Sequence, residues 1–259
     1  MQTQEEKRIW LIQQLLNENV EYKNYNIPVE EYEQKRLLRG LMNVRMPKPI
    51  SKQFLDIQDE YLKSEIAANG IVDIENLNTV PSDDRIILWQ GDITTLKVDA
   101  IVNAANSQMC GCFVENHSCI DNIIHSKAGI SLRLTCYDIM QKQGHEEPTG
   151  KAKITPAYNL PCKYVIHTVG PIVQGQLTKK HCELLESSYR SCLEIAEANE
   201  IESIAFCCIS TGVFMFPNDI AADIAVKTVK DFLNNSKSIK RVIFNVFKDI
   251  DKELYSALL

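Results

Sequence analysis

From Arg85 to the end of the chain, short apolar segments alternate with longer amphipathic ones, and this alternation limits the possible folds more than any other feature. The short segments are rich in β-branched and aromatic residues, which is typical of strands. Six strands are predicted in this way, at residues 85–92, 99–106, 152–160, 163–171, 203–210 and 241–247. The longer segments have the apolar spacing of helices. They span residues 119–143, 179–199 and 219–235, and a further segment, 248–259, follows the last strand.

Near-continuous apolar strands such as 203–208 imply that helices cover both faces of the sheet. We therefore predict an α/β fold, with a mixed six-stranded sheet in a three-layer α-β-α arrangement. Residues 1–80 differ, because their pattern is entirely helical. Apolar residues recur at helical spacing in three stretches separated by prolines, at residues 9–16, 29–42 and 51–67. We expect residues 1–80 to form a helical N-terminal cap on a domain of residues 81–259.

The overall composition argues against several classes of protein. The 259 residues carry a net charge of −6 without a basic stripe or tail, which argues against a nucleic-acid partner. The N-terminal segment has acidic residues ahead of a short amphipathic run, so we expect neither a signal peptide nor a membrane span. A cytoplasmic protein with no membrane partner is therefore predicted. In that compartment the nine cysteines would be reduced, as core thiols, metal ligands or reactive groups.

Three predicted loops carry side chains that suggest chemistry, and each follows the carboxyl end of a strand, where ligands bind in such sheets. Asp92 would either cap a turn or accept a hydrogen bond from an exocyclic amine such as that of adenine. Asn103 and Asn106, at the end of the next strand, would hold hydroxyl groups or merely form a turn.

The third loop, at residues 209–218, contains the sequence Ser-Thr-Gly. Gly212 adds no side chain and can adopt a positive φ, so the backbone there can approach a ligand closely. Backbone N–H groups at such a turn, near the start of a helix, can bind an anion without Lys or Arg. A tight connection from strand to helix is the alternative. Phe214 and Phe216 would be core residues or an aromatic wall for a sugar or base.

The loop of residues 109–119 contains three cysteines and one histidine. Cys112, His117 and Cys119 offer two thiolates and an imidazole, which suit the tetrahedral sites of zinc and also other soft metals. Cys110 is a fourth candidate. Four ligands would close the site and make it structural, whereas three would leave a position open for water or substrate, as in catalytic zinc sites.

Several other residues are interpreted as parts of the core. Cys207 and Cys208 lie inside an apolar strand, where buried and inert thiols are expected. His125 and His167 also have apolar neighbours in the sequence, and we expect them to be hydrogen-bonded core histidines.

The order and spacing of five motifs resemble the macrodomain family: GDIT at 91–94, VDAIVNAANS at 98–107, PTGKAKIT at 148–155, YVIHTVGP at 164–171 and ISTGVFMFP at 209–217. The resemblance covers Arg85 to the C-terminus. It implies that the chain binds ADP-ribose and, as many macrodomains do, removes it from modified proteins. In most members the NAAN loop continues as a run of glycines that ends in an acidic residue. In this chain QMCGCFVENHSCID takes the place of that run. This departure resembles the zinc-dependent subclass of macrodomains found in bacteria and some fungi.

This resemblance implies a set of site residues. One zinc ion per chain would be held by Cys112, His117 and Cys119, with Cys110 as a neighbour that does not bind it. Asn106 would orient the distal ribose. Asp121 matches the acidic position of the family and would act as a catalytic base, unless the zinc ion activates the chemistry instead. ADP-ribose would contact Asp92, Ile93, Asn106, Cys119, Ile120, Asp121, Ser210, Thr211, Gly212, Val213 and Phe214.

The resemblance also implies a substrate and partners. The leading prediction is a hydrolase that removes mono-ADP-ribose from Asp or Glu side chains rather than from arginine. The modified protein would be a lipoyl carrier of the glycine-cleavage type, and a sirtuin-type ADP-ribosyltransferase would modify it. Two other hypotheses are a reader that binds ADP-ribose without cleaving it and a zinc-stabilised interaction module.

Overall fold

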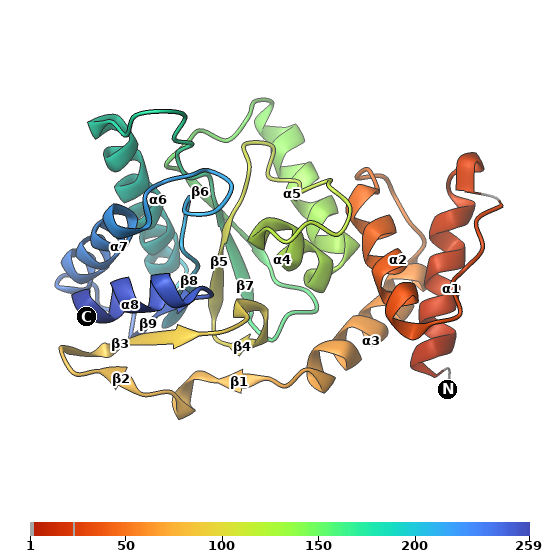
Figure 1. Ribbon diagram of the computed structural model, residues 1–259, viewed down its shortest axis with the longest axis horizontal. Coiled ribbons are helices and arrows are strands. Elements are labelled where there is room, and N and C mark those ends of the chain that lie inside the picture. The colour runs from red at the N-terminus through yellow and green to blue at the C-terminus, as the bar shows by residue number, and fades with distance from the viewer. Residues whose placement is uncertain (1–2, 23) are drawn as a thin grey trace.

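The computed structural model describes residues 3–22 and 24–259, and the molecule is built around a seven-stranded sheet (Figure 1). In order across the sheet, the strands are β2 (Thr79–Val80), β3 (Asp83–Gln90), β9 (Arg241–Val246), β8 (Ser203–Phe206), β5 (Ala100–Ala104), β7 (Tyr164–Thr168) and β6 (Ala152–Pro156). The five central strands run parallel, whereas β2 and β6 pair antiparallel at the two edges. All six predicted strands form, and the mixed sheet is confirmed. The two-residue strand β2 is an additional seventh strand that the sequence did not predict.

The central strands are apolar along their length because both of their faces are covered. Ile101 and Val102 of β5 and Ile204 of β8 have no exposed surface. The covering helices are α4 (Ile120–Ala128) on β5, α6 (Lys179–Ala198) on β6 and β7, α8 (Asp249–Leu258) on β3 and β9, and α7 (Asn218–Leu233) against α6 and α8. The predicted sandwich of helices around a sheet is confirmed.

The segment predicted as one helix, at residues 119–143, is two helices. It forms α4 and α5 (Ile130–Gln143), which are separated by Gly129 with a φ of 93°. A Cβ atom at Gly129 would lie 2.6 Å from the side chain of Gln58, whose Oε1 accepts a hydrogen bond from the Ile130 N–H over 3.0 Å. The prediction of a continuous helix is wrong, because glycine allows the chain to turn here and Gln58 to approach closely.

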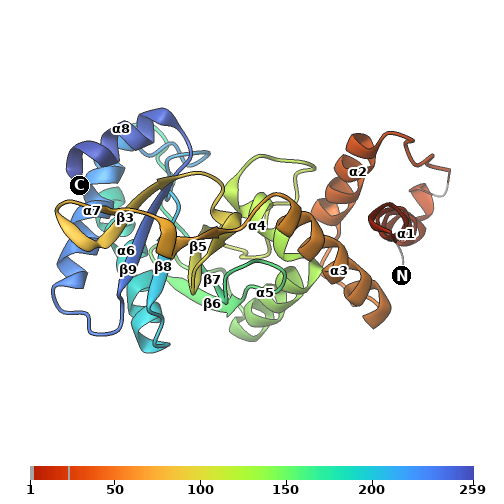
Figure 2. The same cartoon turned by 90° about the horizontal axis from the view of Figure 1, so that it is seen from below.

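The N-terminal region forms the three helices α1 (Gln4–Asn17), α2 (Glu31–Val44) and α3 (Lys52–Ala68), as its sequence pattern predicts. They lie together at one end of the molecule, beyond α4 and α5 (Figures 1 and 2). Their apolar faces form a second core that includes Leu11, Leu38 and Phe54 and extends to Ile130 of α5. Ile66 of α3 belongs to the main core instead. The division of the chain at residue 80 stays a prediction.

Several short elements lie between the longer helices and strands. β1 (Val72–Asp73) and β4 (Leu96–Lys97) pair in parallel. The described residues also form three short 3-10 helices: η1 (Val20–Tyr22), η2 (Ile74–Asn76) and η3 (Ile93–Thr95). Within residues 3–22 and 24–259, none of the helices has the length and apolar character needed to cross a membrane.

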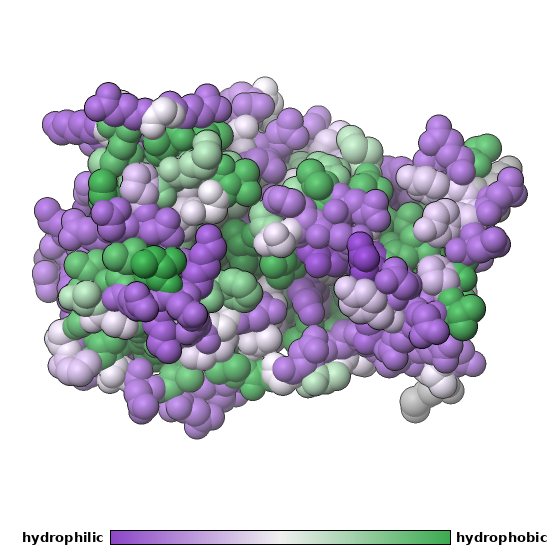
Figure 3. Space-filling model, in the orientation of Figure 1, coloured by the Kyte–Doolittle hydropathy of each residue, from purple (hydrophilic) through white to green (hydrophobic). Residues whose placement is uncertain are grey.

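Because β3, β5 and β8 run parallel, the loops that follow them leave the same edge of the sheet. These are the three loops that the sequence singled out. Figure 3 shows the surface hollowed in the middle of this view, between the loop after β8 and the loop after β5. The three loops therefore border one shared region of the molecule.

Candidate ligand-binding and metal site

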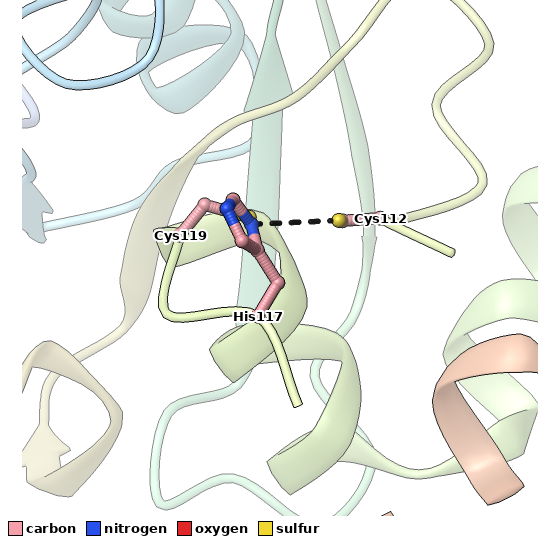
Figure 4. A group of neighbouring side chains, drawn as sticks. All are labelled: Cys112, His117 and Cys119. Atoms are coloured by element: carbon pink, nitrogen blue, oxygen red, sulfur yellow. Dashed lines mark hydrogen bonds between the residues drawn. The ribbon is translucent and has the colours of Figure 1, made fainter. Parts of the chain in front are cut away.

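The structure brings Cys112, His117 and Cys119 together in the loop between β5 and α4 (Figure 4). Their two sulfur atoms and one ring nitrogen all lie within 4.8 Å of one another, and Cys112 Sγ lies 3.6 Å from His117 Nδ1. All three side chains are half-buried. Two thiols and an imidazole at this spacing fit a tetrahedral zinc ion, whose bonds to sulfur and nitrogen are about 2.0–2.3 Å long. Cys110 lies outside this group of potential ligands.

Backbone groups point at both candidate thiolates. The Val114 N–H donates to Cys112 Sγ over 3.5 Å, and the Asn122 N–H donates to Cys119 Sγ over 3.4 Å. Cys119 caps the first turn of α4, where the N–H groups and the helix dipole favour a negative charge. Burial is the stronger influence and raises the pKa of the Cys119 thiol to about 12. A bound cation would offset that cost, because it binds the thiolate form.

Asp121 lies two residues beyond Cys119 and its side chain turns into the protein, with 4% of its surface exposed. Its carboxylate accepts hydrogen bonds from Asn103 Nδ2 over 2.8 Å and from Asn106 Nδ2 over 3.3 Å. Burial raises the pKa of Asp121 to about 6, although the hydrogen bond from Asn103 and the charge of Arg133 lower it. A carboxyl group with this pKa can exchange a proton near neutral pH.

The two asparagines of the NAAN motif have different positions. Asn103 is fully buried and its Nδ2 also lies 3.1 Å from His167 Nδ1, whereas its Oδ1 has no hydrogen-bond partner among the described residues. A contact of Asn103 with a ligand hydroxyl stays a prediction. Asn106 is half-buried, and besides its contact with Asp121 it donates to the Gly111 carbonyl over 3.1 Å. Asn106 Oδ1 accepts from the Gln108 N–H over 3.0 Å, so this residue also shapes the turn. Its role toward a ribose stays a prediction.

Behind Asp121, two core histidines have unequal surroundings. Both ring nitrogens of His167 have partners, since Nε2 lies 3.0 Å from Thr155 Oγ1, and His167 is therefore the hydrogen-bonded core residue expected from the sequence. His125 differs, because neither of its ring nitrogens is hydrogen-bonded among the residues described. His125 Nε2 lies 3.6 Å from Asp121 Oδ1, and the ring lines a cavity of about 10 Å³, roughly enough for one water molecule. Burial lowers the pKa of both histidines, so both are neutral.

Asp92 caps a turn, as its sequence position suggested, and one of its carboxylate oxygens can still accept a hydrogen bond from a ligand. Its Oδ1 caps η3 by accepting from the Thr94 N–H over 2.9 Å and from the Thr94 hydroxyl over 2.6 Å. Its Oδ2 has no hydrogen-bond partner within residues 3–22 and 24–259. This oxygen is free to accept from a ligand. Ile93, the next residue, is buried.

Phe247 directly follows β9 and is 77% exposed, and it was not predicted from the sequence as a site residue. Val246 pairs with Gln90, and Gln90 Nε2 donates to the Phe247 carbonyl over 3.2 Å, so Phe247 lies beside the end of β3 that leads to Asp92. An exposed aromatic ring offers a flat apolar face. Its position as an aromatic residue at the carboxyl end of a predicted strand could have indicated a binding residue from the sequence.

The loop after β8 exposes backbone donors. The N–H groups of Gly212, Val213 and Phe214 donate no hydrogen bond to any of the described residues. Three successive free N–H groups form a suitable site for an anion. A Cβ atom on Gly212 would meet no atom within 4 Å. Phe214 is half-buried, whereas Phe216 belongs to the core.

The sequence suggested a positive φ at Gly212, but the positive φ angles of this loop lie at other residues. They occur at Ser210 and Met215, with φ of 67° and 55°. Gly170 makes room for Ser210, since a Cβ atom there would lie 2.1 Å from Ser210 Oγ. The positive φ angles therefore lie on either side of Gly212, at the buried Ser210 and the exposed Met215, and Gly212 itself contributes open space.

Comparison with known proteins identifies the family. A family model described as "Macro domain" matches residues 102–225. A protein-ADP-ribose hydrolase of Treponema medium is 58% identical over 259 residues, which covers 99% of each chain. The chain belongs to the macrodomain family.

Other macrodomain relatives agree with this assignment. A protein-ADP-ribose hydrolase of Staphylococcus aureus strain MSSA476 is 52% identical over 220 residues, covering 85% of this chain and 82% of the relative. The crystal structure of a Trypanosoma brucei macrodomain in complex with ADP-ribose is 30% identical and has a TM-score of 0.66. The match covers 85% of this chain and 94% of that one. Similarity therefore extends beyond the sheet into the N-terminal part of this macrodomain protein.

Proposed function

We propose that this macrodomain protein hydrolyses the bond between mono-ADP-ribose and the side chain of a modified protein, and that it needs one zinc ion to do so. The relatives that are 58% and 52% identical both carry the name protein-ADP-ribose hydrolase. One structural observation carries the proposal. The group of Cys112, His117 and Cys119 is followed at once, at the start of α4, by the buried carboxylate of Asp121.

ADP-ribose would lie across the three loops at the carboxyl edge of the sheet. The adenine amine would donate to the free Oδ2 of Asp92, with the base against the exposed ring of Phe247. The diphosphate would accept from the free N–H groups of residues 212–214. The distal ribose would then reach Asn106 and the metal ligands. Ile93, Cys119, Ile120, Ser210 and Thr211 would complete the contacts with the ligand.

The proposed reaction adds water to the ribosyl carbon while the bond from that carbon to a carboxylate oxygen breaks, through an oxocarbenium-like state. ADP-ribose and a free Asp or Glu side chain are the products, and the water gives up one proton. Asp121 would accept that proton, because with a pKa of about 6 it is largely ionised at neutral pH. When bound, zinc would supply a Lewis acid that polarises a sugar hydroxyl or activates water.

The metal would be held by Cys112, His117 and Cys119, with a fourth position open. This donor set fits zinc, and three protein ligands are typical of catalytic sites. Cys110 would not bind the metal, since its side chain is buried outside the group and its carbonyl accepts a hydrogen bond from Arg133 Nε over 2.8 Å.

We further propose that the substrate is an Asp- or Glu-linked modification on a lipoyl carrier of the glycine-cleavage type. A sirtuin-type ADP-ribosyltransferase would attach it, in the cytoplasm. The support is the resemblance of residues 108–121 to the loop of zinc-dependent macrodomains.

An incubation with a labelled, mono-ADP-ribosylated lipoyl carrier tests this function. The protein should release labelled ADP-ribose from the Asp- or Glu-linked carrier, stop when a chelator is present, and resume when zinc is restored. A carrier labelled on arginine serves as the matched control and should keep its label. Binding of the labelled carrier without release would instead indicate a reader. Binding of unmodified and modified carrier with equal affinity would indicate an interaction module.

A further inference from the structure

Helix α2 of the N-terminal region touches the loop that carries the candidate metal ligands (Figure 1). Arg39, in the middle of α2, donates from Nη2 to the backbone carbonyl of His117 over 2.6 Å. The same nitrogen donates to Oδ1 of Asn122 over 2.8 Å. One guanidinium nitrogen therefore joins a candidate ligand to the first turn of α4.

Asn122 extends this link to both candidate cysteines. It has no exposed surface, and its Nδ2 donates to the Cys112 carbonyl over 3.3 Å and to the Val114 carbonyl over 2.9 Å. Its backbone N–H donates to Cys119 Sγ over 3.4 Å. Arg39 and Asn122 together thus contact the backbone or side chain of each of the three candidate ligands.

A second contact fixes α2 against the middle of the loop. Asn43, one turn after Arg39, accepts from the Asn116 N–H over 3.0 Å and donates to Ser126 Oγ over 2.8 Å. Gly40 lies between them on the same helix, and a Cβ atom there would lie 2.7 Å from the Glu115 side chain. Glycine has a low helix propensity, but here it leaves room for the loop, which passes directly against the backbone of α2.

The end of α2 is also tied to the start of the loop. Arg133 of α5 is buried and its Nε donates to the Cys110 carbonyl over 2.8 Å. Its Nη1 donates to three carbonyls at the end of α2, those of Met42, Asn43 and Arg45. Cations at the last carbonyls of a helix are favourable, so this arginine holds α2 and the loop in one relative position.

We infer that Arg39 is a positioning residue for the metal site, so that the N-terminal region completes the site rather than only covering the domain. The inference rests on the proposed metal site and deepens it. Arg39 binds the backbone of His117 and the side chain that orients the cysteines, which is the role of an outer-shell partner. Loss of such a partner typically lowers metal affinity about 10–100-fold.

The test measures metal binding directly. Arg39→Met keeps the length of the side chain but donates no hydrogen bond. Arg36→Met is the matched control, because Arg36 lies on the same helix and is half exposed. Its one ion-pair partner among the described residues is Glu33, at 4.0 Å. Zinc affinity is measured by competition with a chromophoric chelator. Cobalt substitution adds a second readout, since the intensity of its d–d bands reports tetrahedral geometry and its near-ultraviolet band reports bound thiolates.

Arg39→Met should bind zinc about 10–100-fold more weakly than the wild type and give an altered cobalt spectrum. Arg36→Met should match the wild type, and Arg39→Lys, which keeps one donor group, should lie between them. ADP is the probe for the rest of the site, and all three variants should bind it as the wild type does.

Two results would overturn the inference while leaving the proposed function in place. One is wild-type zinc affinity in Arg39→Met. The other is a loss of ADP affinity and of thermal stability in metal-free Arg39→Met that parallels its loss of zinc, because that pattern indicates general damage to the fold. A wild-type protein that binds ADP but neither zinc nor cobalt would overturn the metal site itself, and the inference with it.

Discussion

Asn103 of β5 donates a hydrogen bond from Nδ2 to Oδ1 of Asp121 over 2.8 Å, and both side chains are buried. This bond joins one of the inner strands of the sheet to the first turn of α4. The same Nδ2 lies 3.1 Å from His167 Nδ1 on the neighbouring strand β7. The carboxylate of Asp121 is therefore held in place from the sheet behind it, while Asn106 contacts its other oxygen from the loop.

Replacing Asn103 with alanine should destabilise the protein, because it leaves buried atoms of Asp121 and His167 without a partner. A buried polar group that loses its hydrogen bond costs about 1–3 kcal/mol. A loss of that size in the free energy of unfolding is expected from urea titration at pH 7. Asn106→Ala is the control, since Asn106 is half-buried, and should lose less stability and more turnover. An Asn103→Ala protein as stable as the wild type would contradict this role.

Much of the fold is predictable from the sequence because its elements have clear local patterns. The strands around Ile101 and Ile204 are buried on both faces and are apolar throughout. The helical segments have apolar residues at helical spacing. Two errors have identifiable causes. β2 has only two residues, too few to show a pattern, and the break at Gly129 depends on the approach of Gln58, which lies 71 positions earlier in the chain.

The choice of three candidate ligands without Cys110 came from the family resemblance, but that the candidate metal ligands share one loop could be predicted from the residues. The residues that hold their loop could not. Arg39 is 78 positions from His117, and Asn43 is 73 positions from Asn116. Nothing in the pattern of α2 distinguishes Arg39 from the exposed Arg36, because only the packing of α2 on α4 decides which one faces the loop. Such contacts depend on tertiary structure.

Asp92→Ala should weaken the binding of ADP-ribose by about 1.5–3 kcal/mol, the usual cost of losing a hydrogen bond to a charged group. The physical reason is the loss of Oδ2, which has no partner within the described part of the chain. Asp92→Asn separates this role from the cap, because its remaining oxygen can still accept from the Thr94 N–H. Calorimetry should show weakened binding in both variants. Equal affinity in Asp92→Ala and the wild type would exclude the contact with adenine.

Gly212→Glu should abolish ADP-ribose binding, since it adds bulk and negative charge beside the free N–H groups of residues 212–214. The fold should be unaffected, because space at the Cβ position of Gly212 is open. Gly212→Ala adds only a methyl group in that space and should bind nearly as the wild type does. Calorimetry combined with a thermal melt checks both variants. Normal binding by the Glu variant would show that the phosphate site is elsewhere.

The buried His167 should make the protein less stable in acid. Burial lowers its pKa from 6.5 to about 3, so its stabilising contribution is complete above pH 6.5 and is lost as the pH falls from 6.5 toward 3. For this one residue the free energy of unfolding should fall by about 2 kcal/mol between pH 7 and pH 5. His167→Gln should remove that part of the pH dependence. His145→Gln, at an exposed position, should retain it, and urea titrations at both pH values give the comparison.

The purified protein should contain one zinc ion and should need it for turnover. Cys112→Ala and Cys119→Ala should lower zinc content and activity together while the protein stays folded, because both residues lie in a half-buried loop outside the main core. Cys110→Ala is the matched control and should change neither, since Cys110 lies outside the ligand group.

Asp121→Ala separates the two routes of proton transfer, because a general acid or base contributes about 10²–10⁴ in rate. A fall of that size with zinc retained would assign the transfer to Asp121, and a much smaller fall would assign activation to the metal. Zinc content from emission spectroscopy and steady-state rates decide between them. Full activity in a preparation verified to be free of metal would exclude zinc from the mechanism.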